Sequence, residues 1–189
     1  MTRYAKALVI LLALAALPVV ATAQVDKVGK VDTLYAEVGK IDANHWTITI
    51  SFFNDESVVG LSVPLKMTAG LNKIVADSAV YTGGRVEHFS YHAFRADTAI
   101  QCVLLGMIAN TAGPRKRLTP GSGRLATIYV SSLEKKPIEK LDVDTTTVNP
   151  NNSLLVIADS LQGTPPDTVR VDRINSQIIP AFVVRKEKK

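Results

Sequence analysis

Two neighbouring stretches of the sequence alternate strictly between apolar and other residues, and this period of two constrains the fold more than any other feature. In the segment 45–52, HWTITISF, every second residue from Trp46 to Phe52 is apolar. The segment 59–67, VGLSVPLKM, repeats the pattern. Because successive residues of a strand point to opposite faces, both segments are predicted to be half-buried strands. Asn54-Asp-Glu56 between them is typical of a tight turn.

Pro64 stands within the second of these strands. Proline has no backbone N–H to donate to a neighbouring strand. We therefore expect the strand either to lie at the edge of its sheet or to be interrupted at this residue.

The rest of the chain contains further short runs of strand-forming residues, separated by turn residues. The runs lie at 33–38, 77–81, 86–94, 99–108, 124–132, 154–158, 168–172 and 178–184. Gly83-Gly84 and the segment 149–152, NPNN, are among the turn signals between them. About nine or ten short strands with little helix predict an all-β protein, built as a β-sandwich or a β-barrel.

The first 23 residues have the order of a secretory signal peptide. Arg3 and Lys6 precede an uncharged run at 7–17, and Ala-Thr-Ala ends the segment at Ala23. A membrane-spanning helix needs about 20 apolar residues, so this run favours a cleaved signal over an anchor. We expect export to the periplasm or the outside of the cell, with no transmembrane segment in the mature chain. The expected organisation is a signal peptide at 1–23, a linker at 24–30, one β-sandwich domain at 31–184 and a basic tail at 185–189.

The formal net charge of +5 comes from the two ends of the chain. Arg3 and Lys6 contribute +2 and the segment 185–189 contributes +3, so the body of the protein is neutral on balance. The charge therefore gives no reason to expect a nucleic-acid partner. Cys102 is the single cysteine, which excludes an internal disulfide, and we expect it to be a small buried residue.

Several segments occur in the order found in a known family. They are VDTL at 31–34, ISFFNDESVVGL at 50–61, VPLK at 63–66, VYTGGRV at 80–86 and PGSGRLATIY at 120–129. Together they resemble cohesin-like domains, which are β-sandwich modules of exported bacterial proteins and are related in fold to some carbohydrate-binding modules. The resemblance implies an all-β, jelly-roll-like β-sandwich of about nine strands that binds a protein. Its partner would be an exported or cell-surface protein, as dockerin modules are for better-known members.

A polysaccharide-binding module is the alternative function. Phe89 and Tyr91 would share one face of a strand at 86–94, with His88 and His92 on the other face. An exposed pair of aromatic rings could stack on sugars, whereas a buried pair would belong to the core. Exposure of both rings would favour the carbohydrate function, and burial would count against it.

A short basic loop supplies two further candidate binding residues. Arg115 and Arg117 lie beside Pro114. They form either a solvated connection or a contact for an acidic partner or an anionic glycan.

No motif in the sequence predicts catalysis or a metal site. His88 and His92 would lie about 13 Å apart on a strand, too far to bind one metal ion. Asp142, Asp144 and Asp159 have the oxygen ligands that calcium prefers, but calcium needs six to eight of them and no EF-hand spacing is present. We therefore predict no cofactor, with structural calcium as an unsupported alternative. The H-E-x-x-H and G-x-S-x-G motifs are absent, so we predict that the protein is not an enzyme.

Overall fold

The computed structural model describes residues 29–110, 116–159, 161–162, 169–170 and 177–185. These residues form thirteen strand segments and no helix, which confirms the all-β prediction. The strands are β1 (Thr33–Lys40), β2 (His45–Asn54), β3 (Val58–Thr68), β4 (Ile74–Val80), β5 (Tyr91–Asp97), β6 (Cys102–Ile108), β7 (Gly121–Ser132), β8 (Asp142–Thr145), β9 (Leu155–Ala158), β10 (Leu161–Gln162), β11 (Val169–Arg170), β12 (Gln177–Ile178) and β13 (Ala181–Arg185). In the described part of the chain there is accordingly no helix that could cross a membrane.

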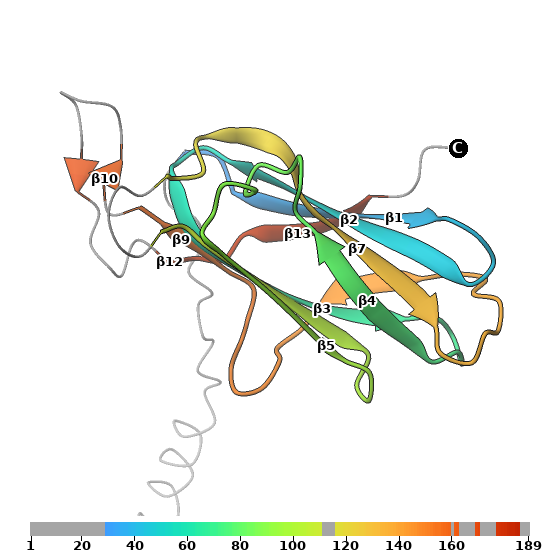
Figure 1. The fold of residues 1–189 in the computed structure, drawn as a ribbon. Coiled ribbons are helices and arrows are strands. Elements are labelled where there is room, and N and C mark those ends of the chain that lie inside the picture. Colours follow the sequence, from blue (N-terminus) through green and yellow to red (C-terminus); the bar gives the residue numbers. More distant parts are fainter. Residues whose placement is uncertain (1–28, 111–115, 160, 163–168, 171–176, 186–189) are drawn as a thin grey trace, which may run out of the picture.

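Two sheets pack face to face and make the predicted sandwich (Figure 1). The first, the β2 sheet, has the order β13-β1-β2-β7-β4. The second, the β3 sheet, has the order β12-β9-β3-β6-β5, and β8 also pairs with β3. All pairs within the two sheets are antiparallel except β1 with β13. Strands β10 and β11 form a separate pair.

The core lies between the two sheets and consists of the apolar positions of the alternating strands. Ile48, Ile50 and Phe52 of β2 are completely buried. Val63 and Leu65 of β3 are buried opposite them in the other layer. Burying one such side chain contributes about 1.5–3 kcal/mol, so the alternating pattern supplies the main stabilisation of the fold.

The expectation for Pro64 is half confirmed. β3 is not an edge strand, because it pairs with β6 on one side and with β9 and β8 on the other. The second side is interrupted: β9 pairs with residues 58–62 of β3 and β8 with residues 65–68. Pro64 lies in the gap between these partners, where its carbonyl oxygen accepts a hydrogen bond from the Thr146 N–H at 3.3 Å. No partner strand there requires the missing N–H.

The strand expected at 86–94 begins late, at Tyr91. Residues 82–88 form turns instead, because the chain folds tightly over β7 at Gly84. A Cβ atom on Gly84 would lie only 2.3 Å from the Leu125 carbonyl oxygen, so only glycine fits this approach. The turns carry Val86 and Phe89 into the core.

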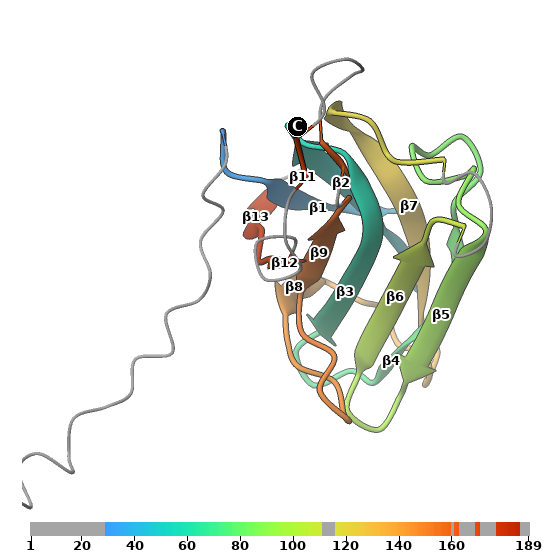
Figure 2. The same ribbon diagram turned by 90° about the vertical axis from the view of Figure 1, so that its left-hand side faces the viewer.

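The registers divide the turns between two ends of the sandwich. The β2–β3 turn lies at one end, which we call the acidic end because it contains Asp55 and Glu56. The β1–β2, β3–β4 and β5–β6 turns lie at the opposite end, together with the segment that follows β7. In Figure 2 the β5–β6 turn is at the bottom of the molecule.

Candidate functional site

The outer face of the β3 sheet is formed by the residues that alternate with the core positions. Figure 2 looks onto this face, with β3, β6 and β5 side by side. The inward positions of β6 are Val103, Leu105 and Met107, all completely buried. The outward positions of β6 are therefore Cys102, Leu104, Gly106 and Ile108.

An apolar row crosses this face near the acidic end. The registers place Tyr91 beside Ile108, Ile108 beside Gly60, and Gly60 beside Ile157. Tyr91 is 57% exposed, and the two isoleucines are about two-fifths exposed. Because Gly60 has no side chain, the middle of the row is low and flat. The row is thus a continuous apolar strip across four strands.

A charged row crosses the same face near its other end. Asp97 pairs with Cys102, Cys102 with Lys66, and Lys66 with Asp144. Cys102 is buried, as expected, and burial raises the pKa of its thiol, so the protonated form is favoured. Lys66 Nζ donates a hydrogen bond to the Ile100 carbonyl oxygen, which holds the ammonium group over the turn.

The outer face of the β2 sheet has a different character. Thr47, Thr49 and Ser51 of β2 are only partly buried and alternate with core residues. Their registers place Thr47 beside Tyr129 and Thr49 beside Thr127. Hydroxyl groups on an open face are satisfied by water, so this face gains little from being covered. The apolar row of the β3 sheet, in contrast, would gain from being covered by a partner.

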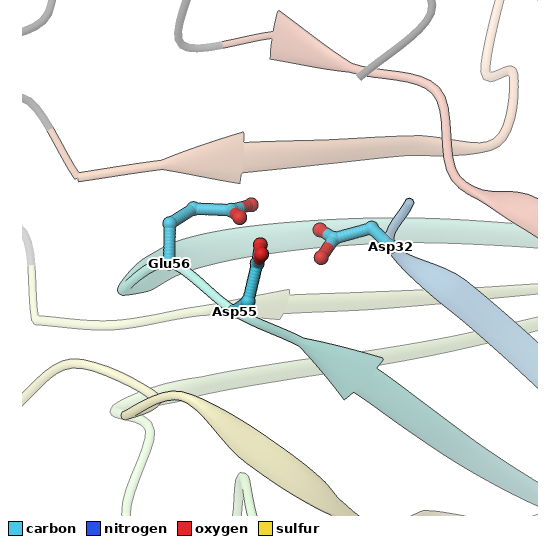
Figure 3. Close-up of side chains that lie close together, drawn as sticks. All are labelled: Asp32, Asp55 and Glu56. Carbon is cyan, nitrogen blue, oxygen red and sulfur yellow. The ribbon is translucent and has the colours of Figure 1, made fainter. Parts of the chain in front are cut away.

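A cluster of three carboxylates lies at the acidic end (Figure 3). Asp32 immediately precedes β1, whereas Asp55 and Glu56 occupy the β2–β3 turn. Each residue offers one oxygen atom, and these atoms lie within 4.8 Å of one another. Asp32 and Glu56 are buried, and each also takes part in further interactions. The cluster has the chemistry of a hard-cation ligand set, but three carboxylates alone do not define one.

Backbone and side-chain groups hold this cluster in place. The Lys30 N–H donates to Asp55 Oδ2. Gly29, with φ of 69°, passes so close that a Cβ atom there would lie 1.9 Å from the same oxygen. Burial lowers the pKa of the Arg85 guanidinium, and the nearby charge of Asp32 opposes part of this shift. Arg85 donates from Nη1 to the carbonyl oxygens of Phe52 and Gly121, each at 3.0 Å.

Phe89 and Tyr91, the aromatic pair expected on one strand face, do not form a joint surface. Phe89 is 4% exposed and belongs to the core, whereas Tyr91 is exposed on β5. β5 begins only at Tyr91, so Phe89 lies before the strand and the two rings are not aligned as they would be on a regular strand. His88 and His92 accordingly do not share a strand face either: His88 Nε2 lies 3.1 Å from the Arg117 carbonyl oxygen. The sequence-based sugar platform is therefore not formed by this pair.

The other candidate residues have structural partners or lie outside the description. Arg117 Nε forms an ion pair with Asp159 Oδ2 at 2.7 Å. Arg115 lies outside the described residues. Asp142 is paired with Lys140 at 2.7 Å and lies at the opposite end of β3 from Asp159, so the three aspartates considered for calcium do not converge. No local pattern indicated that Asp32 would meet the acidic turn, because only the pairing of β1 with β2 brings them together.

Comparison with known proteins finds solved structures with a similar fold but no close relative in sequence. No protein-family model matches the sequence, and no curated protein is significantly similar to it. Among solved structures, the seventh ScaB type I cohesin from Pseudobacteroides cellulosolvens superimposes with a TM-score of 0.51 at 10% identity, over 82% of this chain and 94% of that one. The third ScaC cohesin from Acetivibrio cellulolyticus, in complex with a ScaB dockerin, gives 0.50 at 12% identity, over 82% and 94%.

A third structure agrees with these two. The type I cohesin–dockerin complex Coh-OlpA-Doc918 from Clostridium thermocellum gives a TM-score of 0.51 at 12% identity, over 82% of this chain and 99% of that one. At such low identities the likeness establishes the fold alone. The match covers most of the chain and agrees with the resemblance that the sequence motifs indicated. The chain therefore has a β-sandwich fold similar to that of cohesin domains.

Proposed function

We propose that this protein is an exported, non-catalytic module that binds another protein on the outer face of its β3 sheet. The observation that carries the proposal is the apolar row formed by Tyr91, Ile108, Gly60 and Ile157. A contiguous apolar strip on an exported protein is a liability unless a partner covers it. The row contains no carboxylate, imidazole or amine side chain, so it suits recognition rather than acid–base catalysis.

The shape and charge of this face indicate which kind of partner it would bind. A flat strip with a tyrosine at one end and glycine at its centre accepts a protein surface that projects apolar side chains. Asp97, Lys66 and Asp144 lie near the other end of the same face and would fix the orientation of a charged partner that extends along the face. Two of the similar cohesins were solved in complex with dockerins, which supports an exported or cell-surface protein module as the partner class.

Export rests on the first 23 residues, whose order is that of a signal peptide. A chain beginning at Gln24 contains every described residue of the sandwich. It is therefore the form to use in binding experiments.

The proposal is tested by affinity capture with immobilised chain 24–189 and the native exported fraction of the source cells, before and after removal of polysaccharide. Two variants are compared with the wild type. Ile108→Arg places a charge in the apolar row, and Tyr129→Arg places the same charge on the outer face of the β2 sheet at equal exposure. Both sites are exposed, so neither variant should disturb folding, and circular dichroism checks this.

The proposal expects one protein to be retained by the wild type and by Tyr129→Arg under both conditions, and lost with Ile108→Arg. Retention that is equal for all three proteins would refute a role for the apolar row. Retention of glycan alone, or loss of all binding once polysaccharide is removed, would replace the proposal with the carbohydrate-binding function.

A further inference from the structure

Between β8 and β9 the chain leaves the β3 sheet and returns to the same side of it. β8 pairs with residues 65–68 of β3 and β9 with residues 58–62, both antiparallel. The two strands therefore run in the same direction along one side of β3, and residues 146–154 form an excursion between them. In Figure 1 this excursion is the orange loop that projects from the sandwich. Only residues 63 and 64 of β3 separate the two partners, so strand pairing alone does not require so long a connection.

The tip of the excursion is a turn that is closed by its own hydrogen bonds. The Val148 N–H donates to the Asn152 carbonyl oxygen at 2.9 Å. In return, the Val148 carbonyl oxygen accepts from the N–H groups of Asn151 and Asn152, at 3.2 and 2.8 Å. Val148 and Leu154 are buried and anchor the two sides of the turn. Among the described residues, the hydrogen bonds of 148–152 thus remain within the turn, so a group attached to its tip would disturb neither sheet.

This turn carries the pattern Asn151-Asn-Ser153. It is the one place in the sequence where asparagine is followed two positions later by serine or threonine, with a residue other than proline between them. The pattern is the acceptor signal for N-linked glycosylation, which takes place on surface loops of exported proteins. Asn151 and Ser153 are both exposed, whereas the residue between them is half-buried. The structure therefore supplies the surface loop that the pattern requires.

The side-chain amide of Asn151 is not used by the turn itself. Asparagines in the turns of this protein usually donate from Nδ2 to a backbone carbonyl oxygen, as Asn54 does to Glu56 at 2.6 Å. Even the neighbouring Asn152 donates from Nδ2 to the Val148 carbonyl oxygen, at 3.3 Å. The side chain of Asn151 forms no hydrogen bond with another described residue. Its Nδ2 atom is thus open to a reaction at the protein surface.

We infer that Asn151 is the acceptor of an N-linked glycan. The donor is an oligosaccharide linked to a lipid diphosphate, presented by a transferase at the membrane that the chain crosses. Asn151 Nδ2 forms a bond to C1 of the first sugar, while the bond between C1 and the diphosphate oxygen breaks. The lipid diphosphate leaves with that electron pair, and Nδ2 gives up one proton to a base of the transferase. Glycosylation shares with the proposed function only the premise that the chain is exported.

The test is mass spectrometry of the native protein, purified from the exported fraction of the source cells. Trypsin cleaves after Lys140 and Arg170 and releases the peptide 141–170, which contains Asn151. This peptide should be heavier than its sequence by the mass of a glycan, and fragmentation should place that glycan on Asn151. The peptide also contains serine and threonine residues, so fragmentation distinguishes an N-linked glycan from an O-linked one.

Four variants expressed in the same cells define the site. Asn151→Gln removes the acceptor and Ser153→Ala removes the hydroxyl group of the pattern, so both should lose the added mass completely. Ser153→Thr keeps a hydroxyl group and should keep the glycan. Asn152→Gln is the matched control, because it changes the neighbouring amide of the same turn but leaves the pattern intact. It should carry the same added mass as the wild type.

A native peptide 141–170 with the unmodified mass would overturn the inference. An added mass that fragmentation assigns to a serine or a threonine would also overturn it, as would an added mass that persists in Asn151→Gln. The affinity-capture test of the proposed function changes Ile108, whereas this test changes the turn at 151–153. The two proposals can therefore fail separately.

Discussion

Arg85 is the side chain whose removal the structure predicts to be most damaging outside the apolar core. Its guanidinium donates hydrogen bonds to the carbonyl oxygens of Phe52, Gly121 and Thr119, which belong to β2, β7 and the segment before β7. It therefore fastens three segments at the acidic end. We predict that Arg85→Met destabilises the domain strongly while leaving the fold recognisable.

The magnitude follows from the three contacts. A hydrogen bond from a charged donor contributes about 1.5–3 kcal/mol, but Arg85 is only partly buried and water can replace part of this. The aliphatic part of the side chain lies over Gly123, where a Cβ atom would be 2.9 Å from Arg85 Cδ, and methionine retains that packing. We therefore expect a loss of about 3–5 kcal/mol in the free energy of unfolding. Arg85→Lys keeps the charge but loses the planar fork, and about half of this loss is expected.

Urea unfolding followed by the fluorescence of Trp46, the single tryptophan, measures the effect. Arg124→Met is the matched control, since Arg124 is partly buried like Arg85 but bonds a single backbone carbonyl, that of Thr82, and the hydroxyl of Thr127. It should cost less than about 1 kcal/mol. A similar loss of stability for Arg85→Met and Arg124→Met would refute the reasoning that the Arg85 side chain holds the segments of the acidic end together. A loss below about 1 kcal/mol for Arg85→Met would refute it as well.

Three further predictions concern the interior of the sandwich. Leu105→Ala should lower the free energy of unfolding in urea by about 2–5 kcal/mol, because Leu105 is completely buried between the sheets and the cavity cannot collapse fully. A change near zero would contradict the position of β6 in the core. Arg117→Met should cost about 2 kcal/mol or more, because it removes the ion pair with the buried Asp159, and Lys136→Met at an exposed pair should cost almost nothing. Burial raises the pKa of Tyr81 to about 12, so the folded state holds a proton that the unfolded state releases, and stability should fall as the pH rises from about 10 to 12. Tyr81→Phe should reduce this loss of stability at alkaline pH. An unchanged dependence of stability on pH would contradict the assignment of the loss to Tyr81.

Local pattern was sufficient for the fold class because each strand carries its own signal. The alternation in 45–52 and 59–67 identified β2, β3 and their inward faces, and these faces are the core. The same pattern failed at 86–94, where the sequence continues to alternate but the chain turns. The cause is the contact of Gly84 with β7, forty residues away in the sequence, and no local pattern reports such a contact.

The candidate sites were less accessible to sequence reasoning, because each combines residues from several strands. The apolar row needs the registers of β5, β6, β3 and β9 before its four members become neighbours. Asp32 joins Asp55 and Glu56 only through the pairing of β1 with β2. Sequence spacing had instead grouped Asp142 with Asp159, which the structure separates.

The sequence by itself determined that this chain is an all-β sandwich with alternating half-buried strands, because hydrophobic periodicity acts within each strand. It also indicated a turn at Gly83-Gly84, and the segment PGSG at 120–123 was part of the family resemblance. Only the tertiary structure shows how these two segments meet: the side chain of Arg85 lies across the backbone at Gly121 and Gly123, and a Cβ atom on Gly123 would lie 2.9 Å from Arg85 Cδ. Partnership between distant segments is decided by strand pairing and packing, and these depend on the whole chain.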